Sequence, residues 1–236
     1  MKSVTIIFNK KMKMSELIDA DYRLLLLLNN LNFSLGFGDK TVAEVCKEYN
    51  FNPDCFLFIA NYLSKKCVTD VTETTFANLP LEPFITYLAG SHEYFLEKRL
   101  PNIRRKLGLI FESSDNQKLQ NIVLNFFDNY TKEVYDHMMY ENDVVFPYIN
   151  ALLKGQTDSK YSIDVFEERH NDIENKMADL KQILLKYVSW CPDQMLMANV
   201  LMELYMSGEE LEAHTFIEDE LVIPRVKRIE KEKLGI

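Results

Sequence analysis

The chain has 236 residues, of which 47% are hydrophobic and 27% are charged, a composition typical of a globular protein with one large domain or two smaller ones. Its net charge of −9 argues against a broad nucleic-acid interface, because such an interface needs a basic face. The four cysteines have neither CxxC spacing nor the density of a disulfide framework. No segment has the length of a membrane span or the pattern of a signal peptide, so we expect a cytoplasmic protein without membrane contacts.

Helices are expected along most of the chain, because only 7 glycines and 7 prolines interrupt it. In the N-terminal part, Ser15 is a candidate N-cap for a helix that continues to about Leu31. A turn is expected at residues 36–39, which contain two glycines. A helix over residues 40–49 is then followed by another that starts near Pro53, since proline is favoured in the first helical turn. We therefore expect a small helical domain over residues 1–75.

Two short helices around a tight turn can also form a helix-turn-helix, a unit that reads DNA. Neither helix predicted over residues 40–64 has the basic, polar face that a recognition helix uses. A bundle that packs its apolar faces is therefore the favoured interpretation, and a DNA- or partner-binding module is the alternative. The stretch from Lys65 to Pro80 is rich in threonine and lacks helical periodicity, so we predict a linker there.

Four long helices are predicted over residues 80–236, separated by short polar breaks. Their approximate ranges are 81–110, 115–153, 162–190 and 192–232. Short connections make successive helices antiparallel neighbours. The predicted fold class is therefore all-α, with an up-down-up-down four-helix bundle over residues 80–236 after the small helical N-terminal domain.

The second and fourth of these helices share the pattern H-x3-E-x5-P. It begins at His137 and Glu141 and recurs 77 positions later at His214 and Glu218. Residues four apart in a helix lie one turn apart on the same face, so each histidine and its glutamate can reach one point. Pairing the two helix pairs by a pseudo-twofold axis can bring both motifs to one level of the bundle.

The other two histidines, His92 and His170, lie 78 positions apart on the first and third helices. All four histidines of the chain therefore fall on equivalent positions of a repeated helix pair. Unpartnered imidazoles and carboxylates are costly to bury, so their convergence in a bundle core indicates a metal site. The candidate metal ligands are His92, His137, Glu141, His170, His214 and Glu218.

Four imidazole nitrogens are too few to complete the coordination of two separate ions, but two bridging glutamates would supply further ligands to both. Each ion would then receive two histidine nitrogens and one oxygen from each carboxylate. An oxo or hydroxo bridge would add a fifth ligand and leave one position open. Imidazole and carboxylate ligands with an open position favour two iron ions, and manganese and zinc remain alternatives. The sequence identifies no catalytic residue.

Some acidic side chains near these positions are assigned to the surface. Glu174 follows His170 by four residues, but the equivalent position after His92 is Leu96, which cannot ligate a metal. We therefore expect Glu174 to be a solvated charge. Glu133 and Glu210 precede the two motifs by one turn, and we expect exposed helix charges there, with a hydrogen bond to a ligand histidine as the alternative.

Apolar and aromatic side chains on these helices are expected to surround the centre and fill the core. The aromatic residues expected around the site are Tyr94, Tyr140 and Phe216. The methionines expected to fill the core are Met195, Met197, Met202 and Met206.

This ladder of histidines and glutamates resembles the hemerythrin-like, HHE cation-binding domain family, and within it most closely the RIC (repair of iron centres) proteins. The likeness covers roughly residues 80–236. It implies that the four histidines are terminal iron ligands and that Glu141 and Glu218 are the bridging carboxylates. Oxygen-carrying hemerythrins typically use a fifth histidine, which this sequence lacks. The resemblance therefore favours the more symmetric repair-type site over reversible oxygen carriage.

The N-terminal part also resembles the small domain that precedes the di-iron domain in RIC proteins. The likeness rests on residues 41–45 and on Tyr49. That domain usually carries adjacent cysteines, whereas only the isolated Cys46 and Cys55 are found here. The departure puts a thiol-dependent role in doubt and leaves room for a regulatory module of different function.

The resemblance implies a cytoplasmic di-iron protein that repairs iron–sulfur clusters damaged by oxidative or nitrosative stress. Its expected partners are damaged iron–sulfur proteins and small ligands such as oxygen or nitric oxide, and a homodimer is compatible with the sequence. The alternative is a di-iron sensor of oxygen or nitric oxide that regulates an N-terminal DNA- or partner-binding module. Oxygen or iron storage is a weaker third hypothesis, because one two-metal site stores little.

Overall fold

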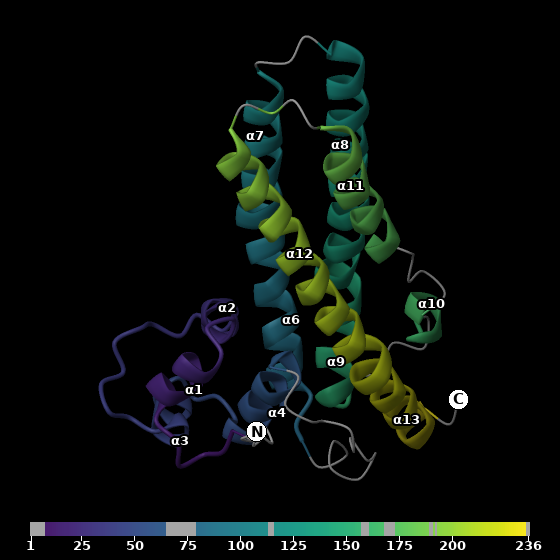
Figure 1. Ribbon diagram of the computed structural model, residues 1–236. Helices are drawn as coiled ribbons and strands as arrows, with labels where there is room; N and C mark the ends of the chain where they lie inside the picture. The colour runs from purple at the N-terminus through teal and green to yellow at the C-terminus, as the bar shows by residue number, and fades with distance from the viewer. Residues whose placement is uncertain are drawn as a thin grey trace, which may run out of the picture. The chain divides into compact units, whose positions relative to one another are not determined.

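The computed structural model describes residues 8–64, 79–112, 116–156, 161–167, 173–188, 191 and 193–234. Within these ranges every regular element is a helix, which confirms the all-α prediction (Figure 1). The chain divides into two compact units, one formed by residues 1–91 with 217–225 and the other by residues 92–216 with 226–236. The domain boundary predicted between residues 75 and 80 stays a prediction.

The first unit contains α1 (Met14–Ala20), α2 (Leu24–Asn30), α3 (Val42–Glu48) and α4 (Pro53–Leu63). The expectation of one helix that begins at Ser15 and continues to Leu31 is wrong. The N-cap of α1 is Lys13, because Glu16 accepts a hydrogen bond from the Lys13 backbone N–H. The helix ends at Ala20 because Asp21 is extended and accepts hydrogen bonds from the backbone and guanidinium of Arg23.

Helices α3 and α4 follow the predicted boundaries closely. Thr41 caps α3 in a capping box with Glu44, and Asn52 caps α4 with Pro53 at its first position. Residues 55–61 of α4 are all buried. This part of α4 therefore has no exposed face with which to contact the DNA major groove.

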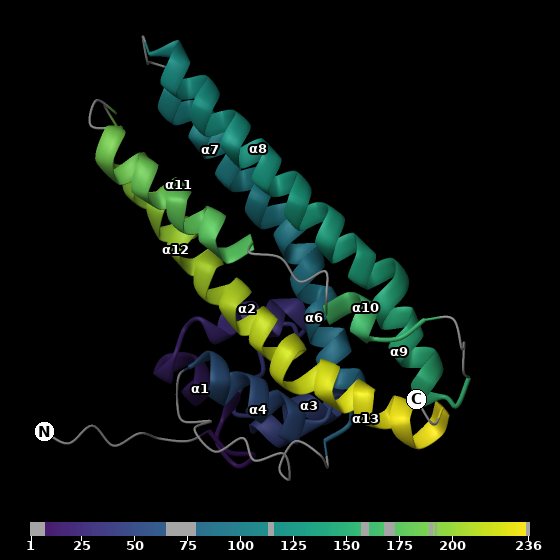
Figure 2. The same ribbon diagram turned by 90° about the vertical axis from the view of Figure 1, so that its right-hand side faces the viewer.

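The long helices of the bundle lie largely in the second unit, and residues 82–91 and 217–225 of these helices belong to the first. Their helical segments are α6 (Glu82–Tyr94, which begins in the first unit), η1 (Phe95–Arg99), α7 (Leu100–Phe111), α8 (Gln117–Tyr140), η2 (Glu141–Val145), α9 (Phe146–Leu153), α10 (Asp164–Glu167), α11 (Ile173–Tyr187), α12 (Gln194–Phe216), η3 (Ile217–Val222, which belongs to the first unit) and α13 (Ile223–Leu234). Helix α7 packs on α8 and α12, and α11 packs on the same two helices, so the four form a closed ring. Figures 1 and 2 show α7 beside α8 and α11 beside α12. The predicted four-helix bundle is therefore confirmed.

Proline explains why three of the long helices contain a π-helical segment. The prolines are Pro101, Pro147 and Pro224, each at the second position after η1, η2 or η3. A proline ring in a regular α-helix clashes with the carbonyl four residues earlier, and the missing N–H breaks the ladder. The π segments insert one extra residue per turn, so that Leu100 and Phe146 donate to carbonyls five residues back, at Phe95 and Glu141.

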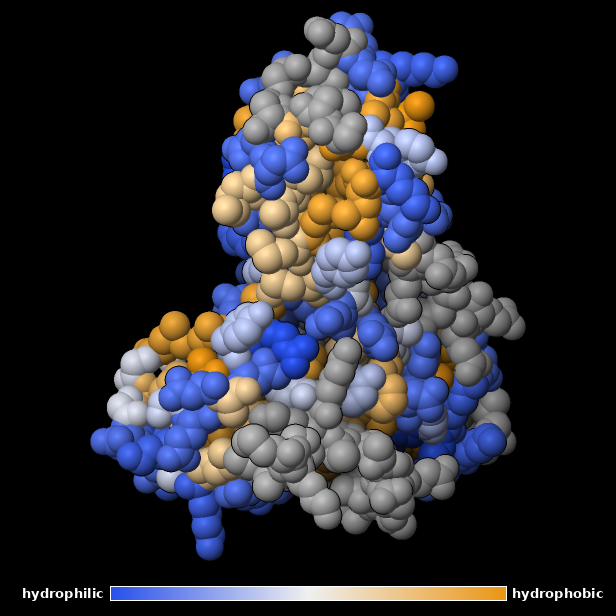
Figure 3. Space-filling view, in the orientation of Figure 1, coloured by the Kyte–Doolittle hydropathy of each residue, from blue (hydrophilic) through white to orange (hydrophobic). Residues whose placement is uncertain are grey.

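The core between α7, α8, α11 and α12 is filled by branched and aromatic side chains. Phe127 and Val134 of α8 and Leu204 of α12 are completely buried. The expected core role of the methionines is wrong at two positions, since Met195 and Met202 are 69% and 55% exposed. They lie on the outer face of α12, and Figure 3 shows hydrophobic surface on the upper part of the bundle.

Among the described helices, none combines the length and the apolar character that a membrane crossing requires.

Candidate metal centre

The candidate ligands lie where the long helices pass from α-helical to π-helical geometry. His92 is in the last turn of α6 and His137 is in the last turn of α8. Glu141 is the first residue of η2. His214 is likewise in the last turn of α12, and Glu218 is the second residue of η3. The π segments, which are frequent at functional sites, thus set the directions of the two glutamate side chains relative to their histidines.

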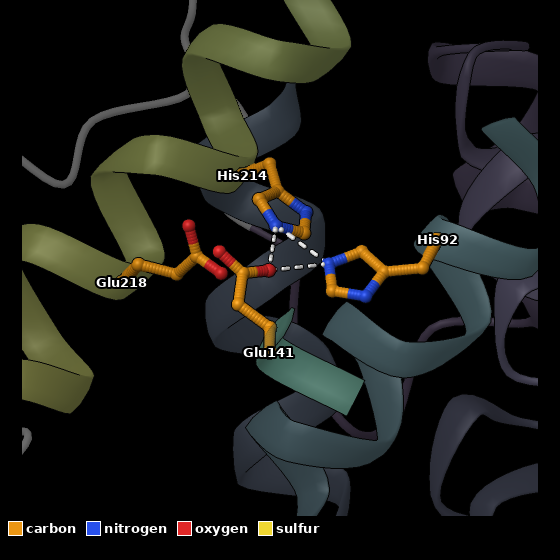
Figure 4. Close-up of side chains that lie close together, drawn as sticks. All are labelled: His92, Glu141, His214 and Glu218. Atoms are coloured by element: carbon orange, nitrogen blue, oxygen red, sulfur yellow. Dashed lines mark hydrogen bonds and ion pairs between the residues drawn. The ribbon is translucent and has the colours of Figure 1, made fainter. Parts of the chain in front are cut away.

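Glu141 is the centre of the cluster, and its two carboxylate oxygens face different histidines. Oε2 lies 2.9 Å from His92 Nε2 and 3.8 Å from His214 Nε2. Oε1 lies 2.8 Å from His137 Nε2. The Nε2 atoms of His92 and His214 are 3.1 Å apart (Figure 4). One oxygen therefore belongs to a group with His92 and His214, and the other belongs to a group with His137.

The cluster is shielded from solvent. His92 and Glu141 are fully buried, and His214 and Glu218 are 3% and 2% exposed. These four residues each present a ligand atom, and the four atoms lie within 4.8 Å of one another. His137 is more accessible, with 17% of its side chain exposed. The sequence-predicted residues that the structure describes are thus brought together at one point, and Figure 4 shows the carboxylate of Glu218 beside that of Glu141.

Asn142 orients His92, and the sequence interpretation did not identify it. Its Oδ1 lies 2.9 Å from His92 Nδ1. With the amide oxygen as acceptor, Nδ1 donates its proton to Asn142, and Nε2 presents a lone pair toward Glu141 and His214. Histidines that bind metals are commonly held through the other ring nitrogen in this way. The only sequence signal was the position of Asn142 next to the motif glutamate.

Aromatic rings pack on two of the imidazoles. Phe146 stacks on His92 with a centroid distance of 5.4 Å, and Phe166 stacks on His137 at 6.2 Å. The sequence interpretation had named other aromatic residues. Of these, Tyr140 lies close enough to Tyr161 for a hydrogen bond between their hydroxyl groups, 3.3 Å apart. The imidazoles are thereby held between apolar rings, which limits both their rotation and the access of water.

The donor set fits a metal ion. Atoms that coordinate one ion at about 2.1 Å, with angles near 90–109°, lie about 3.0–3.4 Å apart. The separations of 2.9 Å and 3.1 Å that His92 Nε2 makes with Glu141 and His214 are close to this range. An imidazole lone pair that faces a carboxylate oxygen is repulsive unless a cation or a proton lies between them. Glu141 and Glu218 are also two adjacent buried carboxylates, and their mutual repulsion likewise requires a cation or a proton between them.

Of the residues named in the sequence analysis, the side chains of two fall outside the part of the chain that the structure describes. His170 lies outside the described residues, and so does the side chain of Glu174. The two glutamates that precede the motifs are described. Glu133 has 49% of its side chain exposed, as expected. Glu210 departs from the expectation, because it has 19% of its side chain exposed and forms an ion pair with Arg99.

Comparison with known families agrees with this arrangement. The model of the hemerythrin HHE cation binding domain matches residues 84–227, a range that includes all six candidate ligands. No curated protein and no solved structure matches the chain. The match covers more than half of the chain, and the buried histidines and glutamates at the centre of the bundle are suited to binding a cation. The chain therefore belongs to the hemerythrin HHE cation-binding domain family.

Proposed function

We propose that this chain is a non-haem di-iron protein that repairs iron–sulfur clusters damaged by oxidative or nitrosative stress. The di-iron part rests on the carboxylate of Glu141, whose two oxygens face different histidines. Its Oε2 faces His92 and His214, and its Oε1 faces His137. A carboxylate with histidines on both oxygens has the arrangement of a bridging ligand between two ions.

In this proposal His92 and His214 hold one ion and His137 and His170 hold the other. Glu141 and Glu218 would supply carboxylate oxygens to both ions. Iron is favoured over manganese or zinc because imidazole and carboxylate ligands with open positions suit it. When bound, such a centre supplies one-electron redox chemistry and open positions for small ligands such as oxygen or nitric oxide.

The surrounding residues prepare the site for that chemistry. Asn142 keeps the Nε2 lone pair of His92 directed inward, and Phe146 holds the ring in place. The burial of Glu141 and Glu218 excludes water, which strengthens their electrostatic interaction with a cation. The site is therefore arranged to hold its ions firmly while His137, on its more exposed side, remains near solvent.

The repair activity is supported by the resemblance to RIC proteins and by the absence of a fifth histidine from the sequence. A thiol mechanism is disfavoured at Cys46 and Cys55, the two cysteines that the structure describes in the first unit. Burial raises the pKa of the Cys46 and Cys55 thiols to about 12, so neither is a reactive thiolate near neutral pH. Repair chemistry would therefore depend on the metal centre.

The test is an anaerobic reactivation assay with an iron–sulfur enzyme damaged by peroxide. The iron-loaded protein should restore activity beyond that obtained with the same amount of iron salts. The matched control is H137A, which removes one proposed ligand and should restore much less. Equal recovery with iron salts alone would refute the repair function while leaving the metal centre intact.

A sensor is the second candidate, favoured by exposed apolar side chains on the first unit. Tyr22 and Leu35 are 70% and 64% exposed, which suits a partner-binding surface better than DNA contact. In a gel-shift screen with apo and iron-loaded protein, metal-dependent retention of DNA would instead favour a DNA-binding sensor.

A further inference from the structure

A polar seam runs between α7 and α12 beside the proposed centre. It consists of Arg99, Asn102 and Lys106 on one side and Glu203 and Glu210 on the other. At the outer end, Glu203 accepts hydrogen bonds from Lys106 Nζ at 2.7 Å and from Asn102 Nδ2 at 3.0 Å. At the inner end, Arg99 Nη2 donates to Glu210 Oε1 at 2.6 Å. Charged groups therefore line this helix interface, where apolar packing is the usual arrangement.

The inner pair is mostly withdrawn from solvent. The Arg99 side chain is 7% exposed and that of Glu210 is 19% exposed. The guanidinium also lies 5.1 Å from the centroid of the Tyr94 ring. Burying an ion pair costs desolvation energy that its own attraction seldom repays, so such a pair is weak evidence for stability. Stability alone therefore does not explain why this pair is buried.

The repeat provides an internal comparison. Adding 77 to Arg99 and Glu133 gives Lys176 and Glu210, and Lys176 forms an ion pair with Glu133. Each of the two equivalent pairs thus joins two neighbouring helices of the bundle, one from each half of the repeat. The second pair is open to solvent, since the Lys176 and Glu133 side chains are 44% and 49% exposed. Of the two equivalent pairs, the one between Arg99 and Glu210 is therefore buried and the one between Lys176 and Glu133 is exposed.

The buried pair lies on the side of one proposed metal position. Glu210 precedes His214 by four residues in α12, which is one turn or about 6 Å along the axis. Arg99 follows His92 by seven residues along the helix formed by α6 and η1. His92 and His214 are the two histidines that face Glu141 Oε2. The exposed pair on α8 and α11 instead belongs to the side of His137.

We propose that Glu210 takes up a proton from solvent when the metal position between His92 and His214 gains an electron, and releases it on oxidation. This proposal rests on the redox-active centre of the proposed function, but not on its repair activity. An external one-electron reductant supplies the electron, which lowers the charge of the centre by one unit. The carboxylate of Glu210 forms an O–H bond with a proton from solvent, which restores the net charge, and Arg99 holds the carboxyl in place.

The charges around Glu210 suit this exchange. Burial raises the pKa of Glu210 to about 7, while the adjacent Arg99 opposes that rise. Among the described residues, Glu209 on α12 also acts on Glu210, and Tyr94 of α6 feels the charges of Arg99, Glu210 and Glu203. Along the same helices, Lys106 of α7 pairs with Glu203, and Lys181 of α11 lies over Tyr205. An added electron disfavours the carboxylate further, so the reduced protein binds the proton more tightly. The midpoint potential should consequently fall as pH rises.

The experiment measures the midpoint potential of the iron-loaded protein between pH 6 and 8 by mediated electrochemical titration. The wild-type potential should fall with rising pH, and E210Q should lose at least half of that slope. E133Q, at the equivalent exposed position, should retain the wild-type slope. E210D, which keeps a carboxyl group, should recover part of it. Redox-difference infrared spectra should show a protonated-carboxyl band in the reduced wild type and in E133Q, but not in E210Q.

Equal slopes in E210Q and E133Q would overturn the proposal. So would a wild-type potential that does not change with pH, or a wild-type infrared spectrum without the carboxyl band. The wild-type infrared spectrum tests the protonation of a carboxyl group on reduction even if E210Q fails to load iron. Wild-type protein that binds no redox-active iron would overturn the di-iron assignment as well, whereas failure of the reactivation assay alone would leave this proposal standing.

Discussion

Asn142 holds an imidazole of the centre through the nitrogen that faces away from the carboxylates. Replacement by alanine removes the acceptor for His92 Nδ1, so the ring can rotate or adopt the other tautomer. Loss of such a supporting hydrogen bond typically weakens metal binding about 10- to 100-fold. We expect N142A to show this loss of iron affinity in a titration with a competing chelator.

The control for N142A is D143A, because Asp143 lies in the same π segment with an exposed side chain. D143A changes the helix at the neighbouring position without touching His92. Its iron affinity should equal that of the wild type. The same loss in both variants would mean that η2 itself had been disturbed, and no loss in N142A would contradict the role given to its amide.

The convergence of the candidate ligands that the structure describes could be predicted from the sequence, because each motif obeys simple helix geometry. A histidine and a glutamate four residues apart share a face, and a repeat of the pair fixes which other histidines are equivalent. Asn142 could not be predicted, since one asparagine beside a motif forms no pattern. The burial of Glu210 was also missed, because only the tertiary packing distinguishes it from the equivalent Glu133.

At the scale of elements, the long helices were predictable and their irregularities were not. Hydrophobic periodicity located the four bundle helices within a few residues at most ends. The prolines of the motifs were visible, but the sequence pattern did not show that a π turn would accommodate them. The outward position of Met195 was missed because periodicity shows an apolar stripe without showing whether another helix covers it.

Gly90 in α6 is needed for close approach to α2. A Cβ atom built on Gly90 would lie 1.8 Å from the backbone oxygen of Asn30, so one of the two helices would have to move. Overpacking of this kind typically costs about 1–3 kcal/mol. We expect G90A to lower the free energy of unfolding by an amount in that range, measured by urea unfolding followed by circular dichroism.

Gly108 in α7 is the matched control for this prediction. Its Cβ would meet only the end of the Arg104 side chain, at 3.8 Å. Because alanine is favoured over glycine in a helix, G108A should be neutral or more stable by about 0.5–1 kcal/mol. Equal effects of the two substitutions would show that the contact between Gly90 and Asn30 does not limit packing.

At the scale of the whole molecule, the bundle buries acids and imidazoles together, so we expect a bound cation to stabilise the folded state. Metal that binds the folded state alone stabilises it by mass action, by about 4 kcal/mol at a thousandfold excess over Kd. For a chain of this size that corresponds to an increase in Tm of about 8–16 °C. Removal of iron by a chelator should lower Tm by a similar amount, measured by calorimetry.

H137A tests whether that stabilisation comes from the centre. It removes the histidine that faces Glu141 Oε1 and leaves His92 and His214 facing Oε2. We expect the variant to retain half of the iron or less, and to lose correspondingly less Tm on chelation. Hydrogen exchange should become faster on chelation in α8 and α12, the helices that carry His137 and His214. If H137A instead bound as much iron as the wild type, with the same change in Tm on chelation, His137 would not be a ligand of the stabilising metal and its assignment would fail.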